Sequence, residues 1–356
     1  MLSYLYNLAT DKSKGGFSCP LKLFLYFISI TYGLALSLLI FVYRLKPCRL
    51  KCRVISVGNI TLGGTGKTSL VALIARYLKS KGHKVAILSR GYKRKITNCR
   101  LPITDYENLG DEPYMLKMNL KDVPVIVDAD RIRSAKKAIR DYGVDTVILD
   151  DGFQQWRIKK DLEIVAIDAT CPFGNRNLIP RGILREPLSS LRRADVFFLT
   201  KTNFGTANNK IKDFLSGINP RALIIESIHQ PVDFYKTGTH EAIGADALQG
   251  KRIALFSGIG DPDSFENLVK GMGMEVGLVF KFRDHHNYTQ QDIDNIIKSA
   301  QDKNIDTIIT TEKDAVRLYS LQLTAYSLQL IVLCIKLKII KDEERFYNRL
   351  LGLYSS

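Results

Sequence analysis

The chain has 356 residues, of which 46% are hydrophobic and 25% are charged, and its formal net charge is +16 at pH 7. This length and composition exclude a disordered or fibrous protein and leave room for two domains with cores of their own. The six cysteines have no paired spacing, so we expect reduced thiols and neither a disulfide framework nor a zinc site. The charge excess favours an anionic partner, whether nucleic acid, an anionic membrane surface or a phosphorylated substrate.

The first predicted element is an apolar helix over residues 23–43, a run without a charged residue. At 1.5 Å per residue the run is about 31 Å long, which matches the hydrocarbon core of a bilayer. It is too long for a cleaved signal peptide, and the remaining alternative is a buried core helix. The basic residues after it suit anionic headgroups on the cytoplasmic side: Arg44, Lys46, Arg49, Lys51 and Arg53. We therefore predict a membrane anchor over residues 1–52, and the sequence leaves open whether the helix spans the bilayer or lies on it.

The body of the chain alternates short apolar runs with amphipathic helices. This pattern predicts an α/β fold with a P-loop NTPase-like, mostly parallel sheet and helices on both of its faces. We expect a P-loop domain over 53–203 and a second, smaller α/β domain over 204–356, whose last helix can pack back on the first domain. The polar stretch 203–221 is the predicted boundary region.

A glycine-rich stretch, "GGTGKT", lies between the first strand of the body and the helix that follows it. Glycines let such a loop turn tightly and point backbone N–H groups at phosphate oxygens. The usual pattern begins with a glycine, but Thr61 stands at that place. Lys67 is expected to reach the β- and γ-phosphates, and the Thr68 hydroxyl is expected to bind Mg²⁺. The predicted nucleotide-binding residues are Thr61, Leu62, Gly63, Gly64, Thr65, Gly66, Lys67 and Thr68.

Two carboxylates follow the strand "VDTVILDD". Asp150 and Asp151 stand at the place where P-loop proteins carry a metal-binding aspartate, so we predict that they contribute to a Mg²⁺ site. The stretch "FFLTKTN" resembles a guanine-reading motif only faintly, because Asn203 occupies the position that needs an aspartate. The sequence therefore favours ATP over GTP.

These motifs together resemble the tetraacyldisaccharide 4′-kinase family, the membrane-bound lipid A 4′-kinases of Gram-negative bacteria. The resemblance rests on stretches that keep one order along most of the chain: "VGNITLGGTGKT", "SRGYKRK", "GDEPYM", "DADR", "LDDGFQ", "IPRGILREPLSSLRRAD", "FSGIGDPDSF", "FRDHHNY" and "TTEKD". The family's loop also lacks the first glycine. Two departures are Ser69, where the family usually has proline, and Gln155, where it usually has histidine.

The resemblance implies transfer of the γ-phosphate of ATP to the 4′-hydroxyl of an acylated glucosamine disaccharide 1-phosphate, giving lipid IVA. It also implies that Asp111 of "GDEP" is the catalytic base and that His285 of "RDHH" is its partner, with His286 the less favoured histidine. Such a pair is chemically reasonable, because a carboxylate can accept the hydroxyl proton while an imidazole orients the carboxylate. We expect the second domain to close over the nucleotide and bring the histidine to Asp111.

Several further residues are candidates for anionic ligands or for the metal. Guanidinium groups suit phosphate oxygens, and the candidates are Arg90, Arg94, Arg181, Arg185, Arg192 and Arg193, with Arg90 and Arg185 favoured for the substrate. Glu186 is expected near the metal or the base, and Gln154 is expected to position a phosphate or a water molecule.

The implied partners are the acylated disaccharide lipid and the inner leaflet of the cytoplasmic membrane, with ATP and Mg²⁺ as cofactors. Neither nucleic acid nor a protein partner is expected, since the basic residues cluster beside the anchor and are not interleaved with aromatic residues. The alternative from another class is a membrane-recruited P-loop ATPase switch that has no lipid acceptor. Against it, Leu62 occupies the place just before the glycines where such switches usually carry a lysine.

Overall fold

The structure is a computed structural model that describes residues 9, 11, 18–90, 110–205, 207–237, 241–318, 321 and 328–355. The chain divides into two compact units, and each is built from separate stretches of the sequence. The first comprises Met1–Gly91, Leu120–Ile228 and Leu337–Ser356, and the second comprises Tyr92–Asn119 and His229–Lys336. The chain thus re-enters the second unit at residue 229 and returns to the first unit at residue 337, whereas the sequence predicted a single boundary at 204.

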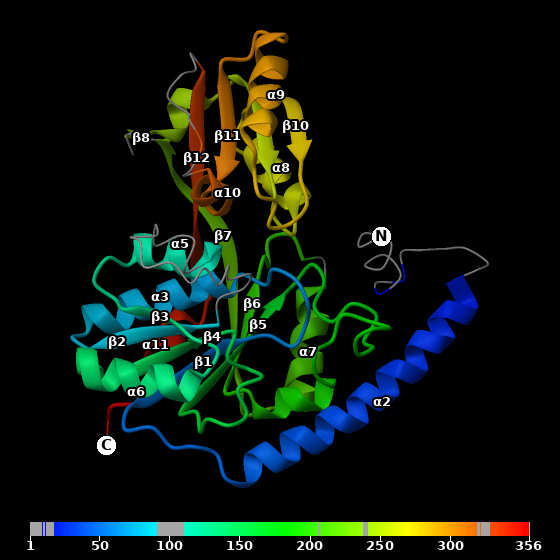
Figure 1. Ribbon diagram of the computed structural model, residues 1–356, viewed down its shortest axis with the longest axis vertical. Coiled ribbons are helices and arrows are strands. Elements are labelled where there is room, and N and C mark those ends of the chain that lie inside the picture. The colour runs from blue at the N-terminus through cyan, green and yellow to red at the C-terminus, as the bar shows by residue number, and fades with distance from the viewer. Residues whose placement is uncertain are drawn as a thin grey trace, which may run out of the picture. The chain divides into compact units, whose positions relative to one another are not determined.

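The first unit is built on a parallel sheet in the strand order β3-β2-β4-β1-β5-β6-β7 (Figure 1). Its strands are β1 (Arg53–Gly58), β2 (Val85–Ser89), β3 (Val125–Val127), β4 (Thr146–Asp150), β5 (Leu162–Asp168), β6 (Val196–Thr200) and β7 (Leu223–Lys236). The register aligns Val57 of β1 with Asp150 of β4, so both strands end at the same edge of the sheet. The loops that follow these two strands are therefore neighbours, as the phosphate-loop motif requires.

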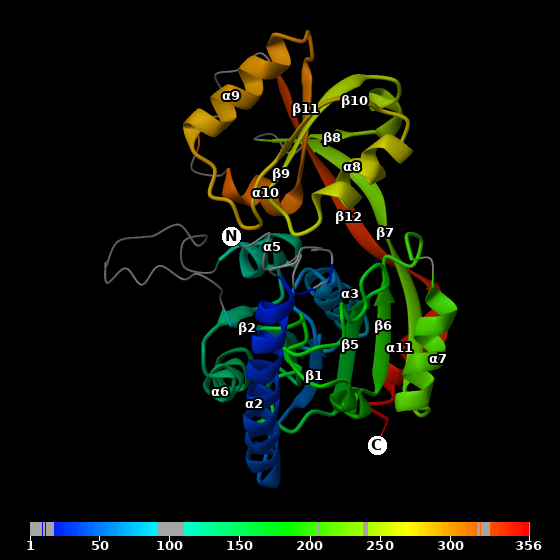
Figure 2. The same cartoon turned by 90° about the vertical axis from the view of Figure 1, so that its right-hand side faces the viewer.

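Helices cover both faces of this sheet (Figure 2). They are α3 (Lys67–Ser80), α6 (Arg131–Tyr142), α7 (Asn208–Ile218) and α11 (Glu343–Leu351), with a 3₁₀ helix, η1, over Leu188–Arg193. Phe197 of β6 packs in the cluster that contains Leu215 of α7, whereas the ring of its neighbour Phe198 lies 5.3 Å from that of Phe346 in α11. Because successive strand residues face opposite sides, α7 and α11 cover opposite faces.

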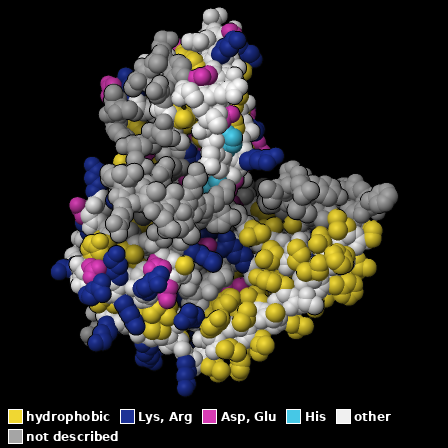
Figure 3. Space-filling model, in the orientation of Figure 1, with side chains coloured by type: hydrophobic (Ala, Val, Ile, Leu, Met, Phe, Trp, Pro, Cys, Tyr) yellow, Lys and Arg dark blue, Asp and Glu magenta, His cyan; other side chains and the backbone are white. Residues whose placement is uncertain are grey.

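The apolar N-terminal helix, α2 (Ser18–Leu45), lies along the first unit. Its Ser29 hydroxyl donates to the Leu178 carbonyl over 2.8 Å, and its Tyr32 hydroxyl donates to the Arg185 carbonyl over 2.9 Å. Outward-facing leucine and phenylalanine side chains give the helix a continuous apolar surface (Figure 3). The span Pro20–Leu45 is long and apolar enough to cross a membrane, and only 11% of its most apolar window is buried. A mostly exposed helix is unlike a core helix, and this agrees with the predicted association with a membrane.

In the second unit the strands follow the order β10-β9-β11-β12, and neighbours in this order are parallel. β12 is hydrogen-bonded to β7, and β8 is antiparallel to β7. The strands are β8 (Ala242–Ile243), β9 (Arg252–Ser257), β10 (Glu275–Lys281), β11 (Thr307–Thr311) and β12 (Gln329–Lys341). The helices are α5 (Asp111–Asn119), α8 (Pro262–Gly271), α9 (Gln290–Gln301) and α10 (Glu312–Arg317), with a 3₁₀ helix, η2, over Ala245–Leu248. One apolar cluster joins the sheet to α8 and another joins it to α9. The predicted α/β architecture with an apolar N-terminal helix is confirmed.

Candidate active site

The phosphate loop begins with an extended segment instead of a glycine turn. Thr61 forms an antiparallel bridge with Leu184, and the Leu62 amide donates to the Ile183 carbonyl over 2.8 Å. Thr61 is 4% exposed, so the bridge lies inside the unit. An extended residue paired in this way does not need the conformational freedom of glycine. This pairing gives the physical reason why threonine is accepted at the first position of the loop.

The second half of the loop forms an open cradle. Gly63 and Gly66 have positive φ values of 111° and 76°, which favour glycine. A Cβ added at Gly63 or Gly64 would meet no atom of the described residues within 4 Å, so this part of the chain leaves the tip of the loop open. The loop is held from behind, because the buried Thr65 hydroxyl accepts from the Asn59 side chain over 3.1 Å. The cradle opens at the amino end of α3, where unpaired N–H groups favour an anion.

Lys67 and Asp151 meet at the mouth of this cradle. Asp151 has a left-handed backbone with φ 53°, and its Oδ1 lies 3.6 Å from the Lys67 Nζ. That oxygen is buried and has no hydrogen-bond partner among the described residues, while Oδ2 accepts from the Arg185 guanidinium over 2.8 Å. Burial by itself would raise the pKa of Asp151, but Lys67 and Arg185 hold the pKa below its usual value. The site therefore presents an ionised carboxylate with an unsatisfied oxygen.

The other predicted metal ligands are Thr68, Asp150 and Glu186, which lie in the same unit, and one of them does not fit a metal site. Asp150 is 3% exposed and accepts from the Ser89 hydroxyl over 3.1 Å, and Thr68 lies in the first turn of α3. Hydroxyl and carboxylate oxygens are the donors that Mg²⁺ prefers, so Thr68, Asp150 and Asp151 fit this ion. Glu186 is the exception, as its surroundings show.

Glu186 is fully buried, and both of its oxygens already accept hydrogen bonds. Oε1 accepts from the Gln154 amide and the Trp156 indole, each over 3.1 Å, and Oε2 accepts from the Arg193 guanidinium over 2.9 Å. Gln154 also donates to the Asn59 carbonyl over 3.0 Å. Glu186 thus orders Gln154 behind the loop, and both of its oxygens are already engaged by neighbouring side chains.

Two arginines lie at the carboxyl edge of the sheet near these carboxylates. Arg90 follows β2 and is exposed, whereas Arg131 at the start of α6 is 2% exposed. Burial lowers the pKa of Arg131 to about 10, and its Nε is buried with no hydrogen-bond partner in the part of the chain that the structure describes. Arg131 belongs to the "DADR" motif, whose pattern alone does not predict a buried arginine beside these carboxylates. The remainder of "SRGYKRK", including Arg94, lies outside the described residues.

The second unit carries Asp111 and His285, which lie together. His285 Nδ1 is 2.9 Å from Asp111 Oδ2, and the same oxygen accepts from Arg317 Nε over 2.6 Å. Burial would raise the pKa of Asp111, but the hydrogen bond with His285 and the charge of Arg317 hold that pKa well below its usual range. Both partners come from one compact unit, so domain closure is not needed to bring them together, contrary to the expectation from sequence.

Arg317 is the residue of this cluster that sequence analysis missed. Its side chain is 1% exposed, and Nη1 donates to the Gly258 carbonyl over 2.8 Å and to Asp314 Oδ1 over 3.0 Å. Asp314 also accepts from the Tyr288 and Thr311 hydroxyls. This fully bonded network fixes Arg317 behind Asp111 and His285. The spacing of Asp314 and Arg317 along α10 was the only signal for it in the sequence.

A glycine cradle, a lysine and paired carboxylates at the carboxyl edge of a parallel sheet define a P-loop nucleotide-binding protein. A family model described as tetraacyldisaccharide-1-P 4′-kinase matches residues 21–355. The chain belongs to this family.

Individual relatives agree with the family model. The tetraacyldisaccharide 4′-kinase of Halothermothrix orenii is 39% identical over 340 residues, covering 88% of each chain. That of Elusimicrobium minutum is 37% identical over 311 residues, covering 83% of this chain and 82% of the relative. The crystal structure of LpxK from Aquifex aeolicus in complex with ATP has a TM-score of 0.72 and 28% sequence identity, covering 94% of this chain and 99% of that chain. The family predicted from the sequence motifs is confirmed.

Proposed function

We propose that the protein transfers the γ-phosphate of ATP to the 4′-hydroxyl of tetraacyl-disaccharide 1-phosphate, forming lipid IVA in lipid A biosynthesis. The observation that carries this proposal is the open glycine cradle with Lys67 and Asp151 at its mouth, in a chain of this kinase family. The relative from Aquifex aeolicus was crystallised with ATP, which supports ATP as the donor.

In this proposal the cradle holds the triphosphate. The N–H groups of the loop and of the α3 amino end bind phosphate oxygens, and the Lys67 ammonium contacts the β- and γ-phosphates. Thr68, Asp150 and Asp151 are the residues that would hold Mg²⁺, and the ion would neutralise charge on the transferred group. Arg185 and Asp151 hold each other in place over 2.8 Å. Arg90, Arg131 and Arg185 are candidates for binding the anionic substrate.

The acceptor hydroxyl is activated by the pair in the second unit. Asp111 is ionised at neutral pH because His285 and Arg317 favour its charged form. A carboxylate in this state can orient the 4′-hydroxyl and accept its proton, sharing that proton with the imidazole as a coupled pair. The proton therefore leaves the hydroxyl as the phosphoryl group arrives.

The apolar helix α2 fits a substrate that stays in the bilayer. We place the protein at the inner leaflet of the cytoplasmic membrane, where the acyl chains remain in the lipid and the sugar lies at the headgroup level. The hydrogen bond from Tyr32 to the Arg185 carbonyl links this helix to the segment that carries Arg185. The enzyme then meets the sugar without extracting the lipid.

The test is transfer of label from γ-labelled ATP into tetraacyl-disaccharide 1-phosphate by the detergent-solubilised protein with Mg²⁺. Wild type is compared with Lys67→Ala and Asp111→Asn, and with the exposed α6 variant Lys137→Gln as control. Label in the lipid that disappears in the first two variants and persists in the third supports the proposal. If instead ATP is hydrolysed at a rate that the lipid does not change, and no label enters the lipid, the result would favour an ATPase switch.

A further inference from the structure

A basic hollow lies in the first unit at the edge of the sheet opposite to the phosphate loop. It has a volume of about 910 Å³ and is bordered by the residues just before β6 and β7 and by α11. The phosphate loop follows the carboxyl end of β1, whereas this hollow adjoins the amino ends of β6 and β7. Strands rise about 3.3 Å per residue, so the length of β6 alone separates the two edges by roughly 16 Å. The hollow is therefore not part of the nucleotide cradle.

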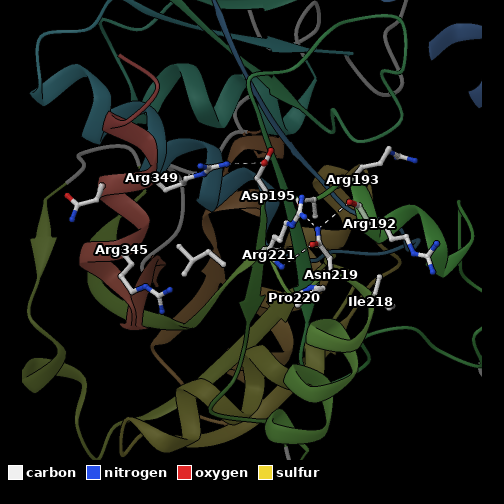
Figure 4. A pocket seen from close by; sticks show the side chains of 13 residues that line it. Arg192, Arg193, Asp195, Ile218, Asn219, Pro220, Arg221, Arg345 and Arg349 are labelled. Atoms are coloured by element: carbon white, nitrogen blue, oxygen red, sulfur yellow. Dashed lines mark hydrogen bonds and ion pairs between the residues drawn. The ribbon is translucent and has the colours of Figure 1, made fainter. Parts of the chain in front are cut away.

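Its lining carries far more positive than negative charge. The charged side chains that line it are Arg192, Arg193, Arg221, Arg345 and Arg349, against the single carboxylate of Asp195. Figure 4 shows Arg345 and Arg349 reaching from α11 on one side, and Arg192 on the other side. We call this feature the arginine pocket.

The arginines differ in whether a nearby carboxylate already neutralises their charge. Arg193 is turned inward, with its guanidinium over the Phe153 ring and bonded to Glu186. Arg349 pairs with Asp195 over 3.0 Å, and Arg345 pairs with Asp342 over 3.1 Å.

Arg192 and Arg221, in contrast, are exposed and have no carboxylate within ion-pair distance among the residues that the structure describes. Clustered guanidinium groups repel one another, so an unneutralised cluster favours the binding of an anion.

The backbone that presents these two arginines is held by the half-buried side-chain amide of Asn219. Asn219 Nδ2 donates to the Arg192 carbonyl over 3.2 Å and to the Ala194 carbonyl over 2.8 Å, while its Oδ1 accepts from the Arg221 amide over 3.2 Å. The pocket wall is therefore a built element and not a chance meeting of two flexible loops. Pre-organised donors lose less entropy when a ligand binds.

We propose that the arginine pocket binds a phosphate-bearing anion. Planar guanidinium forks match phosphate oxygens and form two parallel hydrogen bonds with them. None of the described side chains that line the pocket is aromatic, so these residues offer no platform on which a nucleobase could stack. The ligand is recognised through its phosphate, which can belong to a free solute or to the headgroup of an anionic phospholipid. This inference does not depend on the proposed kinase reaction.

The first arm of the test uses inorganic pyrophosphate, titrated calorimetrically into the full chain in neutral detergent. Because the nucleotide cradle also binds phosphates, the titration is made in the Lys67→Ala background, with and without Arg192→Gln and Arg221→Gln together. The matched control is Lys136→Gln with Lys137→Gln, which removes two positive charges from exposed positions on α6. We expect the arginine substitutions to weaken pyrophosphate binding about tenfold or more, and the control to leave it unchanged.

The second arm uses a short-chain phosphatidylglycerol, with the matching phosphatidylcholine as the uncharged comparison. Binding of phosphatidylglycerol alone, lost with Arg192→Gln and Arg221→Gln, supports the pocket and assigns it to a lipid headgroup. Binding of pyrophosphate alone, lost in the same variant, supports the pocket and assigns it to a free solute. The proposal is overturned if both probes bind the arginine variant and the lysine variant equally well. It is also overturned if neither probe binds the protein.

Discussion

Arg317 donates from Nε to Asp111 Oδ2 over 2.6 Å, and that same oxygen lies 2.9 Å from His285 Nδ1. One carboxylate oxygen is thus held by a cation and an imidazole that are themselves close, since Arg317 Nη2 is 3.2 Å from His285 Nδ1. The arrangement stabilises the charged carboxylate and fixes the ring of the histidine. Arg317 acts through Asp111 and His285, so we regard it as a positioning residue.

Replacing Arg317 by glutamine should lower kcat more than it raises KM, by roughly 10- to 100-fold, because the acid–base pair loses its orientation. The substitution also removes a cation that lowers the pKa of Asp111, so this pKa should rise toward the ordinary carboxyl value of 3.8 or above it. The acidic limb of the kcat/KM profile should therefore move to higher pH.

The control for this variant is Arg252→Gln, which removes a half-exposed arginine from the second unit. A kcat that falls in Arg317→Gln without movement of the acidic limb would contradict the electrostatic part of the argument. Arg317→Lys should recover part of the pH profile, because a lysine restores the charge but not the forked hydrogen bonds.

The two adjacent histidines should differ sharply when each is replaced by asparagine. His285 contacts Asp111, whereas His286 Nε2 is 3.1 Å from Asp292 Oδ2 and its ring stacks on Phe282 at 4.6 Å. His285→Asn should reduce kcat by about 10²- to 10⁴-fold, the usual range for loss of an acid–base partner. His286→Asn should lower the thermal midpoint and change kcat little, and equal losses of kcat in both would refute the assignment. Steady-state kinetics and thermal unfolding distinguish the two effects.

The meeting of Lys67 and Asp151 could be predicted from the sequence because each follows a strand of the same parallel sheet. A glycine-rich loop after one parallel strand and carboxylates after its neighbour must meet at one edge of the sheet. The bridge between Thr61 and Leu184 could not be predicted, since no local pattern links residues so far apart in the chain. The same holds for Asp111 and His285, which only the family resemblance brought together.

The polar stretch 203–221 shows where composition misleads. It was expected to mark a domain boundary, but it contains α7, whose Ile211 and Leu215 pack into the core of the first unit. These two residues have the four-residue spacing of a helix face. The many polar residues on the opposite face of the helix obscured this apolar spacing in the sequence.

Docking of α2 against the body should be disturbed by Gly33→Val. A Cβ at Gly33 would lie 2.7 Å from Leu178 Cδ1, which is closer than atoms normally approach. Moving the helix outward would break the hydrogen bonds of Ser29 and Tyr32 with the body, each worth about 1 kcal/mol.

Trypsin should then cut the basic segment 46–51 faster in Gly33→Val. Ala35→Val, which adds the same bulk at an exposed position of α2, should be cut at the wild-type rate. Equal cleavage of the two variants would show that the docking is not held at Gly33.

Replacing Glu186 by glutamine distinguishes a structural carboxylate from a metal ligand. In the structure its oxygens accept from Gln154, Trp156 and Arg193, and its side chain is fully buried. Removing the charge leaves the buried guanidinium of Arg193 without its closest partner, and breaking such a pair typically costs about 3 kcal/mol. We therefore expect Glu186→Gln to lower the free energy of unfolding by about that amount.

The requirement for Mg²⁺ gives the second readout of this variant, because the two roles predict opposite results. If Glu186 only orders Gln154 behind the loop, the Mg²⁺ concentration for half-maximal activity should stay near that of the wild type. Asp151→Asn is the comparison, since Asp151 Oδ1 is buried, has no hydrogen-bond partner among the residues described, and lies 3.6 Å from Lys67 Nζ. That variant should need much more Mg²⁺ while unfolding at a similar temperature. A Glu186→Gln protein with normal stability and a strongly raised Mg²⁺ requirement would make Glu186 a metal ligand after all, and its three hydrogen bonds would then have to break when the ion binds.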